Sequence, residues 1–231
     1  MNLLHHRDRI EGDLVIEVAF TDVSLSLGDA AGAEVRSEAL RHVAEATGAG
    51  PVLMRQVHGA GVGLVTDGGT RAPQTCDAMI TAQPGVALLA RAADCVPVLL
   101  ADPATGWIAA VHSGRPGLAV GVVPAAVEAL RGRGADPAVA WIGPHVCGAC
   151  YEVPAQMQDE VAALVPQARS TTSWGTPALD LGAGVHAQLA AAGITDVRDV
   201  DTCTREDAAW PSHRRDGAAS TRFAGVIWSH P

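Results

Sequence analysis

Two histidines and one cysteine of this 231-residue chain adjoin apolar segments, where the ends of strands would place them. His58 follows one such segment, and Cys95 comes directly before the run Val96–Ala101. His112 follows the run Trp107–Val111. Strand ends are where α/β folds carry reactive groups, and two imidazoles with one thiolate form a zinc ligand set that leaves a fourth position open. Because the intervals between the three are long, spacing alone leaves packed core residues as the alternative.

Two further motifs are weaker. Cys147 to Cys150 reads C-x-x-C, but no second pair accompanies it at a zinc-site spacing. We therefore interpret it as a structural turn, since a thioredoxin-type redox role would need a βαβ context. The segment Gly182–Ala187 matches the dinucleotide pattern G-x-G-x-x-A, but it comes too late in the chain for a Rossmann domain to follow.

A dense polar run, Ser212–Gly217, lies near the C-terminus and contains His213, Arg214 and Arg215. Adjacent arginines suit phosphate or carboxylate groups, because each guanidinium offers several donors in a fixed geometry. The run is therefore a candidate anion clamp, with a solvated loop as the alternative.

Alternating strands and helices must position these side chains. We expect strands at Leu14–Phe20, Val52–Gln56, Val62–Val65, Val86–Ala90, Val96–Ala101, Trp107–Val111, Val139–Ile142 and Ala224–Trp228. We expect helices at Glu34–Thr47, Leu118–Arg131, Ala155–Leu164 and Gly184–Ala192. Continuous apolar strands between helices are typical of an α/β fold whose sheet is covered on both faces. No repeat or linker divides the chain, so we predict a single domain over residues 1–231, with a mixed sheet layered with helices.

Composition excludes several classes of function. All 16 basic residues are Arg, so a Walker P-loop and a Schiff-base enzyme, both of which need Lys, are excluded. The formal net charge of −9 argues against a nucleic-acid partner, which would need a basic face. The segment Met1–Gly12 lacks the apolar core of a signal peptide, and no apolar stretch is long enough to cross a membrane. We therefore expect a cytoplasmic protein without membrane contact, whose five cysteines are free thiols, ligands or a nucleophile.

Short segments across nearly the whole chain, taken in order, resemble the YfiH / laccase-domain family, also called polyphenol oxidase-like or DUF152. The segments are Gln56–Gly59, Cys76–Thr81, Ala93–Val98, Ala110–Gly114, Gly143–Val153, Leu179–Leu181, Asp201–Thr204 and Ser212–Gly217. The resemblance implies a YfiH-like α/β domain with a zinc site whose ligands fall on His58, Cys95 and His112. It also implies a purine nucleoside phosphorylase that acts on adenosine, inosine, guanosine and methylthioadenosine, and adenosine deaminase activity is reported for the family.

Three segments depart from the family pattern. The family usually has H-A-G-W-R-G, whereas His112–Gly117 reads H-S-G-R-P-G. The Gly-rich segment expected after Phe20–Asp22 is missing, and Ser220–Arg222 replaces the usual T-G-R. The resemblance therefore defines the metal ligands better than it defines the substrate.

Zinc-assisted phosphorolysis is the function that we favour, with a nucleoside and phosphate as partners and zinc rather than copper as the cofactor. The metal would polarise a substrate oxygen or hold a hydroxide near neutral pH. Arg115, Arg214 or Arg215 would position the phosphate, and His213 would contact the substrate. The same hydroxide would serve a deamination by attacking a carbon of the purine ring.

Three other functions stay open at this stage. Cys95 could be the nucleophile and His112 its base in a metal-free hydrolase that cuts an amide of a peptidoglycan precursor. One Cys and two His also match a blue-copper site, but multicopper polyphenol oxidases need further His ligands in H-x-H pairs, which this chain lacks. A degenerate, non-catalytic member that keeps its zinc would explain the altered loop after His112. The sequence does not define the oligomeric state.

Overall fold

The computed structural model describes residues 4–66, 68 and 73–231. The first three residues of the N-terminal segment considered above lie outside the described residues. Among the residues described, no helix combines the length and the apolar character that a membrane crossing requires.

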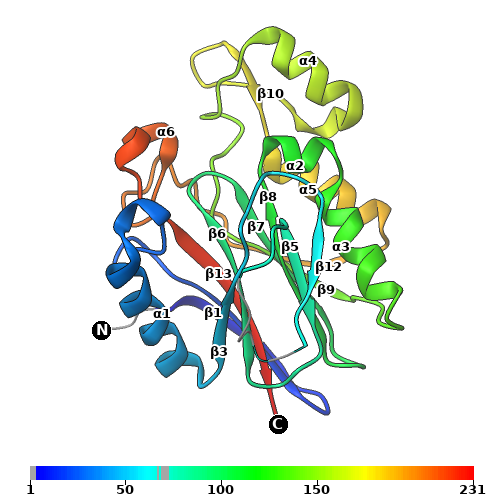
Figure 1. The fold of residues 1–231 in the computed structure, drawn as a ribbon. Helices are drawn as coiled ribbons and strands as arrows, with labels where there is room; N and C mark the ends of the chain where they lie inside the picture. Colours follow the sequence, from blue (N-terminus) through cyan, green and yellow to red (C-terminus); the bar gives the residue numbers. More distant parts are fainter. Residues whose placement is uncertain (1–3, 67, 69–72) are drawn as a thin grey trace.

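Two mixed β-sheets form the centre of the molecule (Figure 1). The first sheet has the spatial order β1 (His5–Ile10), β2 (Val15–Phe20), β13 (Phe223–His230), β6 (Val86–Ala92) and β3 (Gly50–Leu53). The second has the order β12 (Asp196–Asp199), β9 (Val139–Ile142), β7 (Val96–Asp102), β8 (Trp107–Ser113), β5 (Ala78–Thr81) and β4 (Val62–Leu64). The sheets face each other, because strands β6 and β13 of the first contact β7 and β8 of the second.

Helices cover the outer faces of this pair of sheets. The helices are α1 (Ala33–Thr47), α2 (Arg115–Ala119), α3 (Val122–Arg131), α4 (Ala155–Leu164), α5 (Leu181–Ala191) and α6 (His213–Asp216). Helix α1 lies against the first sheet, and α2, α3 and α5 lie on the side of the second (Figure 1). A small hairpin, β10 (Arg169–Thr171) and β11 (Pro177–Leu179), packs against α4.

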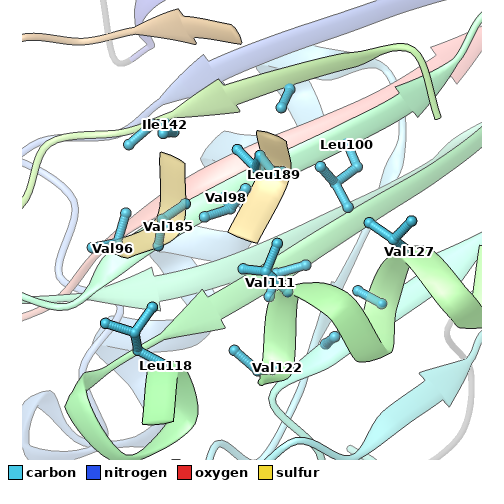
Figure 2. Close-up of a cluster of buried hydrophobic side chains, with 14 of the residues drawn as sticks. Val96, Val98, Leu100, Val111, Leu118, Val122, Val127, Ile142, Val185 and Leu189 are labelled. Carbon is cyan, nitrogen blue, oxygen red and sulfur yellow. The ribbon is translucent and has the colours of Figure 1, made fainter. Parts of the chain in front are cut away.

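Strand β7 shows why the central strands read as continuous apolar runs. Val98 and Leu100 belong to the core under the helices, together with Val111 and Val127 (Figure 2). Leu99, between them in the sequence, belongs to the core between the two sheets. Since successive side chains of a strand point to opposite faces, both faces must be covered. The predicted α/β fold with a mixed sheet layered with helices is therefore confirmed, and the structure adds that a second sheet covers one face.

Most predicted elements differ from the structure by one to three residues at an end, and two of the differences change how the chain is arranged. The helix expected at Leu118–Arg131 is two helices, because Gly121 adopts a left-handed conformation (φ +79°) that ends α2 and begins α3. Pro124 is accommodated in the first turn of α3, where its missing N–H costs no helical hydrogen bond. The strand expected to reach Gln56 ends at Leu53, so the residues that follow form the loop that carries His58.

Candidate functional site

His58, Cys95 and His112 come together at one end of the sheets, and we call them the cavity triad. The Nε2 atom of His58 lies 3.7 Å from the Sγ atom of Cys95. The two imidazole rings are 4.7 Å apart between centroids and cross at 78°. One ligand atom from each residue lies within 4.8 Å of the others, so the three can bind a single metal ion.

Antiparallel pairing explains two of the three positions. Strands β7 and β8 pair with Val96 opposite Ser113 and Pro97 opposite His112. Cys95, directly before β7, therefore lies beside the residues that end β8. The prediction that strand ends would gather these side chains agrees with this geometry for Cys95 and His112, whereas His58 lies in a loop beyond β3. The metal-binding role of all three stays a prediction.

Asp77 brings the third residue into place. Its buried carboxylate accepts backbone N–H bonds from Val57, from His58 at 2.9 Å and from Gly59 at 2.7 Å. His58 has φ +60°, a conformation that costs a non-glycine residue free energy and that these bonds hold in place. The same carboxylate lies 2.9 Å from Nδ1 of His112. Because an ionised carboxylate only accepts, Nδ1 is the donor, which leaves Nε2 free to bind a metal ion.

Charges within the triad favour a thiolate in the metal-free protein. Burial opposes ionisation of Cys95, but the neighbouring His112 and His58 outweigh it and lower the pKa of the thiol to about 6. Burial likewise opposes protonation of His112, yet Cys95 and Asp77 raise the pKa of the imidazole. The pair therefore approaches a thiolate beside an imidazolium, which is the state of an activated cysteine nucleophile. A metal ion would bind the same thiolate but would need His112 without the proton on Nε2.

Gly114 keeps the centre of the triad clear. A Cβ atom at this position would lie 2.5 Å from Cδ2 of His58 and 2.9 Å from Sγ of Cys95. Only glycine leaves room for the two ligands to approach each other, which explains the Gly directly after β8.

A cavity of about 460 Å³ opens over the triad. Besides the triad, its walls include His213, Gln56, Asp29, Arg91 and Arg222. Among the four predicted substrate contacts, only His213 lines this cavity. Sequence reasoning missed Arg91, whose apolar strand gave no signal of a functional side chain, and Arg222, which lies in the altered segment Ser220–Arg222.

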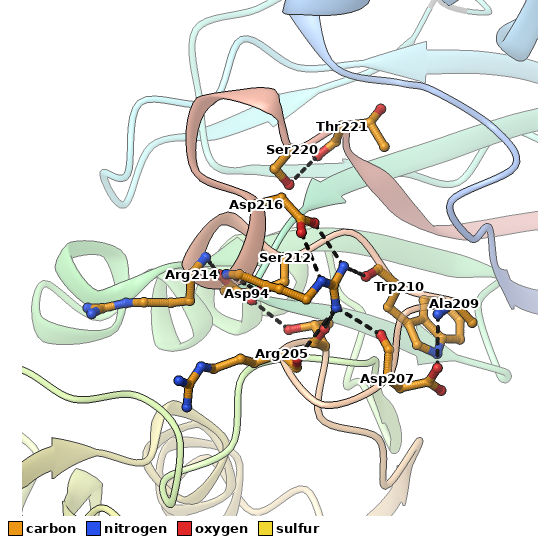
Figure 3. Close-up of polar contacts among 12 residues, drawn as sticks. Asp94, Arg205, Asp207, Ala209, Trp210, Ser212, Arg214, Asp216, Ser220 and Thr221 are labelled. Atoms are coloured by element: carbon orange, nitrogen blue, oxygen red, sulfur yellow. Dashed lines mark hydrogen bonds and ion pairs between the residues drawn. The ribbon is translucent and has the colours of Figure 1, made fainter.

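The other three predicted contacts lie elsewhere. Arg115 begins α2 and is absent from the cavity walls. Arg214 donates its backbone N–H to Asp94 at 2.6 Å (Figure 3). Its guanidinium lies 4.6 Å from the centre of the Tyr151 ring.

Arg215 uses its guanidinium to hold the chain together. It donates to the carbonyls of Thr204 and Trp210, both at 2.8 Å, and to the carboxylate of Asp216 at 2.8 Å. These bonds occupy the donors that a phosphate would need. The predicted role of these arginines as phosphate ligands therefore gains no support from their contacts.

A second group of ligand-type side chains lies apart from the cavity, and we call it the thiol cluster. It consists of Cys147, Cys150, Cys203 and Glu206. Their ligand atoms also lie within 4.8 Å of one another. Folding thus brings a second pair of ligand-type side chains, Cys203 and Glu206, from the C-terminal part of the chain to the C-x-x-C sequence. Burial and the neighbouring Cys203 thiol raise the pKa of Cys147 to about 12, so this cysteine is a poor nucleophile near neutral pH.

Comparison with known proteins gives a family by sequence and a shared fold by structure. The model of the family described as multi-copper polyphenol oxidoreductase laccase matches residues 8–230. The chain is 50% identical over 222 residues to a Streptomyces coelicolor protein named purine nucleoside phosphorylase SCO2081, covering 93% of this chain and 90% of that protein. It is 48% identical over 217 residues to a Streptomyces griseus protein named purine nucleoside phosphorylase ORF3, covering 88% and 86%.

Solved structures share the whole fold. The hypothetical protein YfiH of Bacillus licheniformis superposes with a TM-score of 0.84 at 24% identity, covering 99% of both chains. YlmD from Geobacillus stearothermophilus superposes with a TM-score of 0.83 at 25% identity, covering 100% of both chains. The arrangement of two sheets and their helices is therefore a known one.

Proposed function

The chain belongs to the multi-copper polyphenol oxidoreductase laccase family, and from that membership we propose that it is a zinc-dependent purine nucleoside phosphorylase. The observation that carries the proposal is the 50% identity, over nearly the whole chain, to a relative named for that activity. The triad supports the proposal, because its three ligand-type side chains face a cavity in which a substrate could reach a bound metal ion. We include adenosine, inosine, guanosine and methylthioadenosine as substrates, and adenosine deamination as a second activity of the same site.

In phosphorolysis the bonds that form and break belong to the two substrates, phosphate and the nucleoside. An oxygen of phosphate bonds to the C1′ atom of the ribose while the C1′–N bond to the purine breaks. The bonding electron pair leaves with the purine nitrogen, which then gains a proton. The products are the free base and ribose 1-phosphate, and positive charge builds on the ribose between them. Catalysis therefore depends on placing phosphate and nucleoside together and on stabilising charge.

The cavity triad fits a zinc ion. His58 and His112 would contribute neutral imidazoles and Cys95 a thiolate, which is a three-ligand set of the kind found in catalytic zinc sites. Zinc would supply Lewis acidity toward an oxygen of the substrate. Asp77 fixes the orientation of the His112 ring through Nδ1 and holds the backbone of His58, so the ligands are placed before any metal arrives.

Arginines and a histidine on the cavity walls form the candidate phosphate site. Arg91 is buried, and its Nη1 atom donates to the Leu27 carbonyl at 3.0 Å and to Asp29 at 2.9 Å. Arg222 and His213 lie on the same walls, and Nη1 of Arg222 already donates to the carbonyls of Ser220 at 3.0 Å and Thr221 at 2.7 Å. A phosphate would therefore use the remaining N–H groups of the two arginines. A dianionic phosphate would be attracted by these groups, because guanidinium groups bind phosphate oxygens through charge-assisted hydrogen bonds.

The test is release of hypoxanthine from inosine by purified, zinc-loaded protein, with and without phosphate. We expect release that requires phosphate and yields ribose 1-phosphate in equal amount, and loss of both products in His112→Ala. The same samples, given adenosine, are assayed for ammonia to test deamination, and their metal content distinguishes zinc from copper. A background rate in fully zinc-loaded protein would overturn the proposal.

One observation favours a second candidate, a cysteine hydrolase that cuts an amide of a peptidoglycan precursor. The lowered pKa of Cys95 beside His112 is the state of a nucleophilic cysteine and its base. The two candidates differ in their need for metal. Chelator-treated protein that retains full activity, and that loses it on alkylation of Cys95, would favour the hydrolase.

A further inference from the structure

The thiol cluster joins two loops that leave neighbouring strands. Strands β9 and β12 pair in parallel, and the loops that follow them carry Cys147 and Cys203. His145 donates its N–H to the carbonyl of Thr202 at 3.3 Å, and its own carbonyl accepts the N–H of Thr204 at 3.0 Å. The two loops therefore run side by side into the cluster.

Each loop makes the same turn after its first cysteine. The carbonyl of Cys147 accepts the N–H of Cys150 and the N–H of the next residue, both at 3.0 Å. The carbonyl of Cys203 accepts the N–H of Glu206 at 3.2 Å and that of the next residue at 3.0 Å. Both turns thus hold ligand-type side chains at positions one and four, which is the spacing of a C-x-x-C metal site.

The two turns face each other with their ligand atoms already close. The Sγ atom of Cys203 accepts the N–H of Cys147 at 3.4 Å, and the Sγ atom of Cys150 lies 3.3 Å from Oε1 of Glu206. All four ligand atoms lie within 4.8 Å of one another. Zinc–sulfur bonds of about 2.3 Å place tetrahedral ligands about 3.8 Å apart, so a small contraction completes the site. All five cysteines of the chain are free thiols, so no disulfide competes for these sulfurs in this fold.

We propose that the thiol cluster binds a zinc ion as a closed, structural site. Three soft thiolates select zinc over hard ions such as magnesium or calcium, and a carboxylate supplies the fourth tetrahedral ligand. With four protein ligands the ion has no position for water or substrate, so it stabilises the fold and takes no part in the reaction. The charge left on the ligands is balanced in part by Arg205, which lies within the Cys203 turn and stacks 5.0 Å from the Trp174 ring.

The site connects to the cavity through Asp94, the residue before Cys95. Asp94 has φ +85°, and its carbonyl accepts the N–H of Val146 at 3.1 Å from one of the two loops. Its carboxylate accepts the hydroxyl of Thr204 at 2.7 Å from the other loop. Figure 3 shows Asp94 beside Arg214 at the start of α6. A metal that locks the two loops therefore also holds the backbone that presents Cys95 to the cavity.

The test measures metal in a protein whose cavity triad has been removed, so it does not depend on the proposed phosphorylase activity. His58→Ala and Cys95→Ala together eliminate the triad as a zinc site. We expect this double variant, expressed with zinc, to retain about one zinc ion per chain. Adding Cys203→Ser should eliminate the bound zinc, whereas adding Cys76→Ser, which changes a buried thiol outside both groups, should leave it unchanged.

A spectroscopic measurement covers the case in which the Cys203→Ser variant fails to fold. Cobalt replaces zinc in the double variant, and thiolate ligands give intense near-ultraviolet charge-transfer bands that carboxylate and imidazole ligands do not. We expect such bands together with the visible bands of tetrahedral cobalt. Glu206→Cys should keep the metal and strengthen the charge-transfer bands. Absence of zinc and of these cobalt bands in the double variant, or a disulfide within the thiol cluster in protein prepared without air, would overturn the proposal.

Discussion

The cavity triad and the thiol cluster use the same kinds of ligand in opposite settings. The triad collects one ligand from a loop and two from the facing ends of β7 and β8, and it faces a cavity of about 460 Å³. The thiol cluster collects four ligands from two matching turns and is the closed site of the pair. The difference shows how one fold can hold a catalytic and a structural metal site. A metal ion needs an open coordination position to bind a substrate, and four protein ligands leave no such position.

The largest effect in this comparison should come from the triad. His112→Ala removes a ligand and leaves the charge of Asp77 unpaired, so we expect kcat/KM for phosphorolysis to fall about 10³-fold or more, equivalent to about 4 kcal/mol of transition-state stabilisation. Steady-state kinetics with inosine and phosphate measures the loss. His186→Ala is the matched control, because this histidine is exposed and pairs with Asp199 at 2.8 Å. Equal losses in the two variants would contradict the assignment of the triad.

The thiol cluster should show the reverse pattern, a large loss of stability with a smaller loss of rate. A metal that binds only the folded chain stabilises it by about 4 kcal/mol when its free concentration is about 1,000 times Kd. Cys203→Ser should therefore lower the Tm of the zinc-loaded protein more than His112→Ala does, and lower kcat less. Thermal unfolding with and without a chelator measures the first effect. A Tm that a chelator does not change would contradict a structural zinc in this cluster.

The sequence predicted the two groups unequally, and the reason lies in their separation along the chain. His58, Cys95 and His112 each adjoin an apolar segment, so the pattern that marks strands also marks their ends. Cys203 and Glu206 each lie 56 positions from their contact partners, and nothing local links them to the C-x-x-C turn. Only the parallel pairing of β9 with β12 brings them together.

The fold shows a similar division between local and non-local information. Strand Val139–Ile142 and helix Ala155–Leu164 have the predicted bounds, because their apolar patterns are local. Strand Asp196–Asp199 was missed, since a short, partly exposed edge strand carries no such pattern. The two-sheet arrangement was missed as well, because an apolar strand looks the same whether a helix or a second sheet covers it.

A smaller effect should come from the residue that orients the triad. Asp77→Asn keeps the shape of the side chain but loses the charge that holds Nδ1 of His112 and three backbone N–H groups. We expect zinc affinity at the triad to fall about 10- to 100-fold, while zinc in the thiol cluster is unaffected. Competition with a chromophoric chelator resolves the two ions. Asp102→Asn is the control, because this buried carboxylate lies at the opposite end of β7 from Cys95 and accepts the N–H groups of Ala104 and Asp136. A loss of both ions in Asp77→Asn alone would show that the two groups are not separate sites.

The smallest effect is a difference in thiol reactivity in metal-free protein. The pKa of Cys95 is lowered to about 6, so its thiolate persists above that pH and is lost by protonation as the pH falls through it. The pKa of Cys147 is raised to about 12, so its thiol stays protonated across the same range. Alkylation of Cys95 should therefore slow about tenfold between pH 7 and pH 5, while Cys147 stays nearly unmodified at both values. Mass spectrometry of quenched iodoacetamide reactions measures both rates.

In His112→Ala the imidazolium is gone, and the fall in the Cys95 rate should move to higher pH. A Cys95 alkylation rate that does not change in His112→Ala would show that the two side chains do not interact. That result would contradict both the zinc site and the nucleophile with its base, because each requires contact between Cys95 and His112.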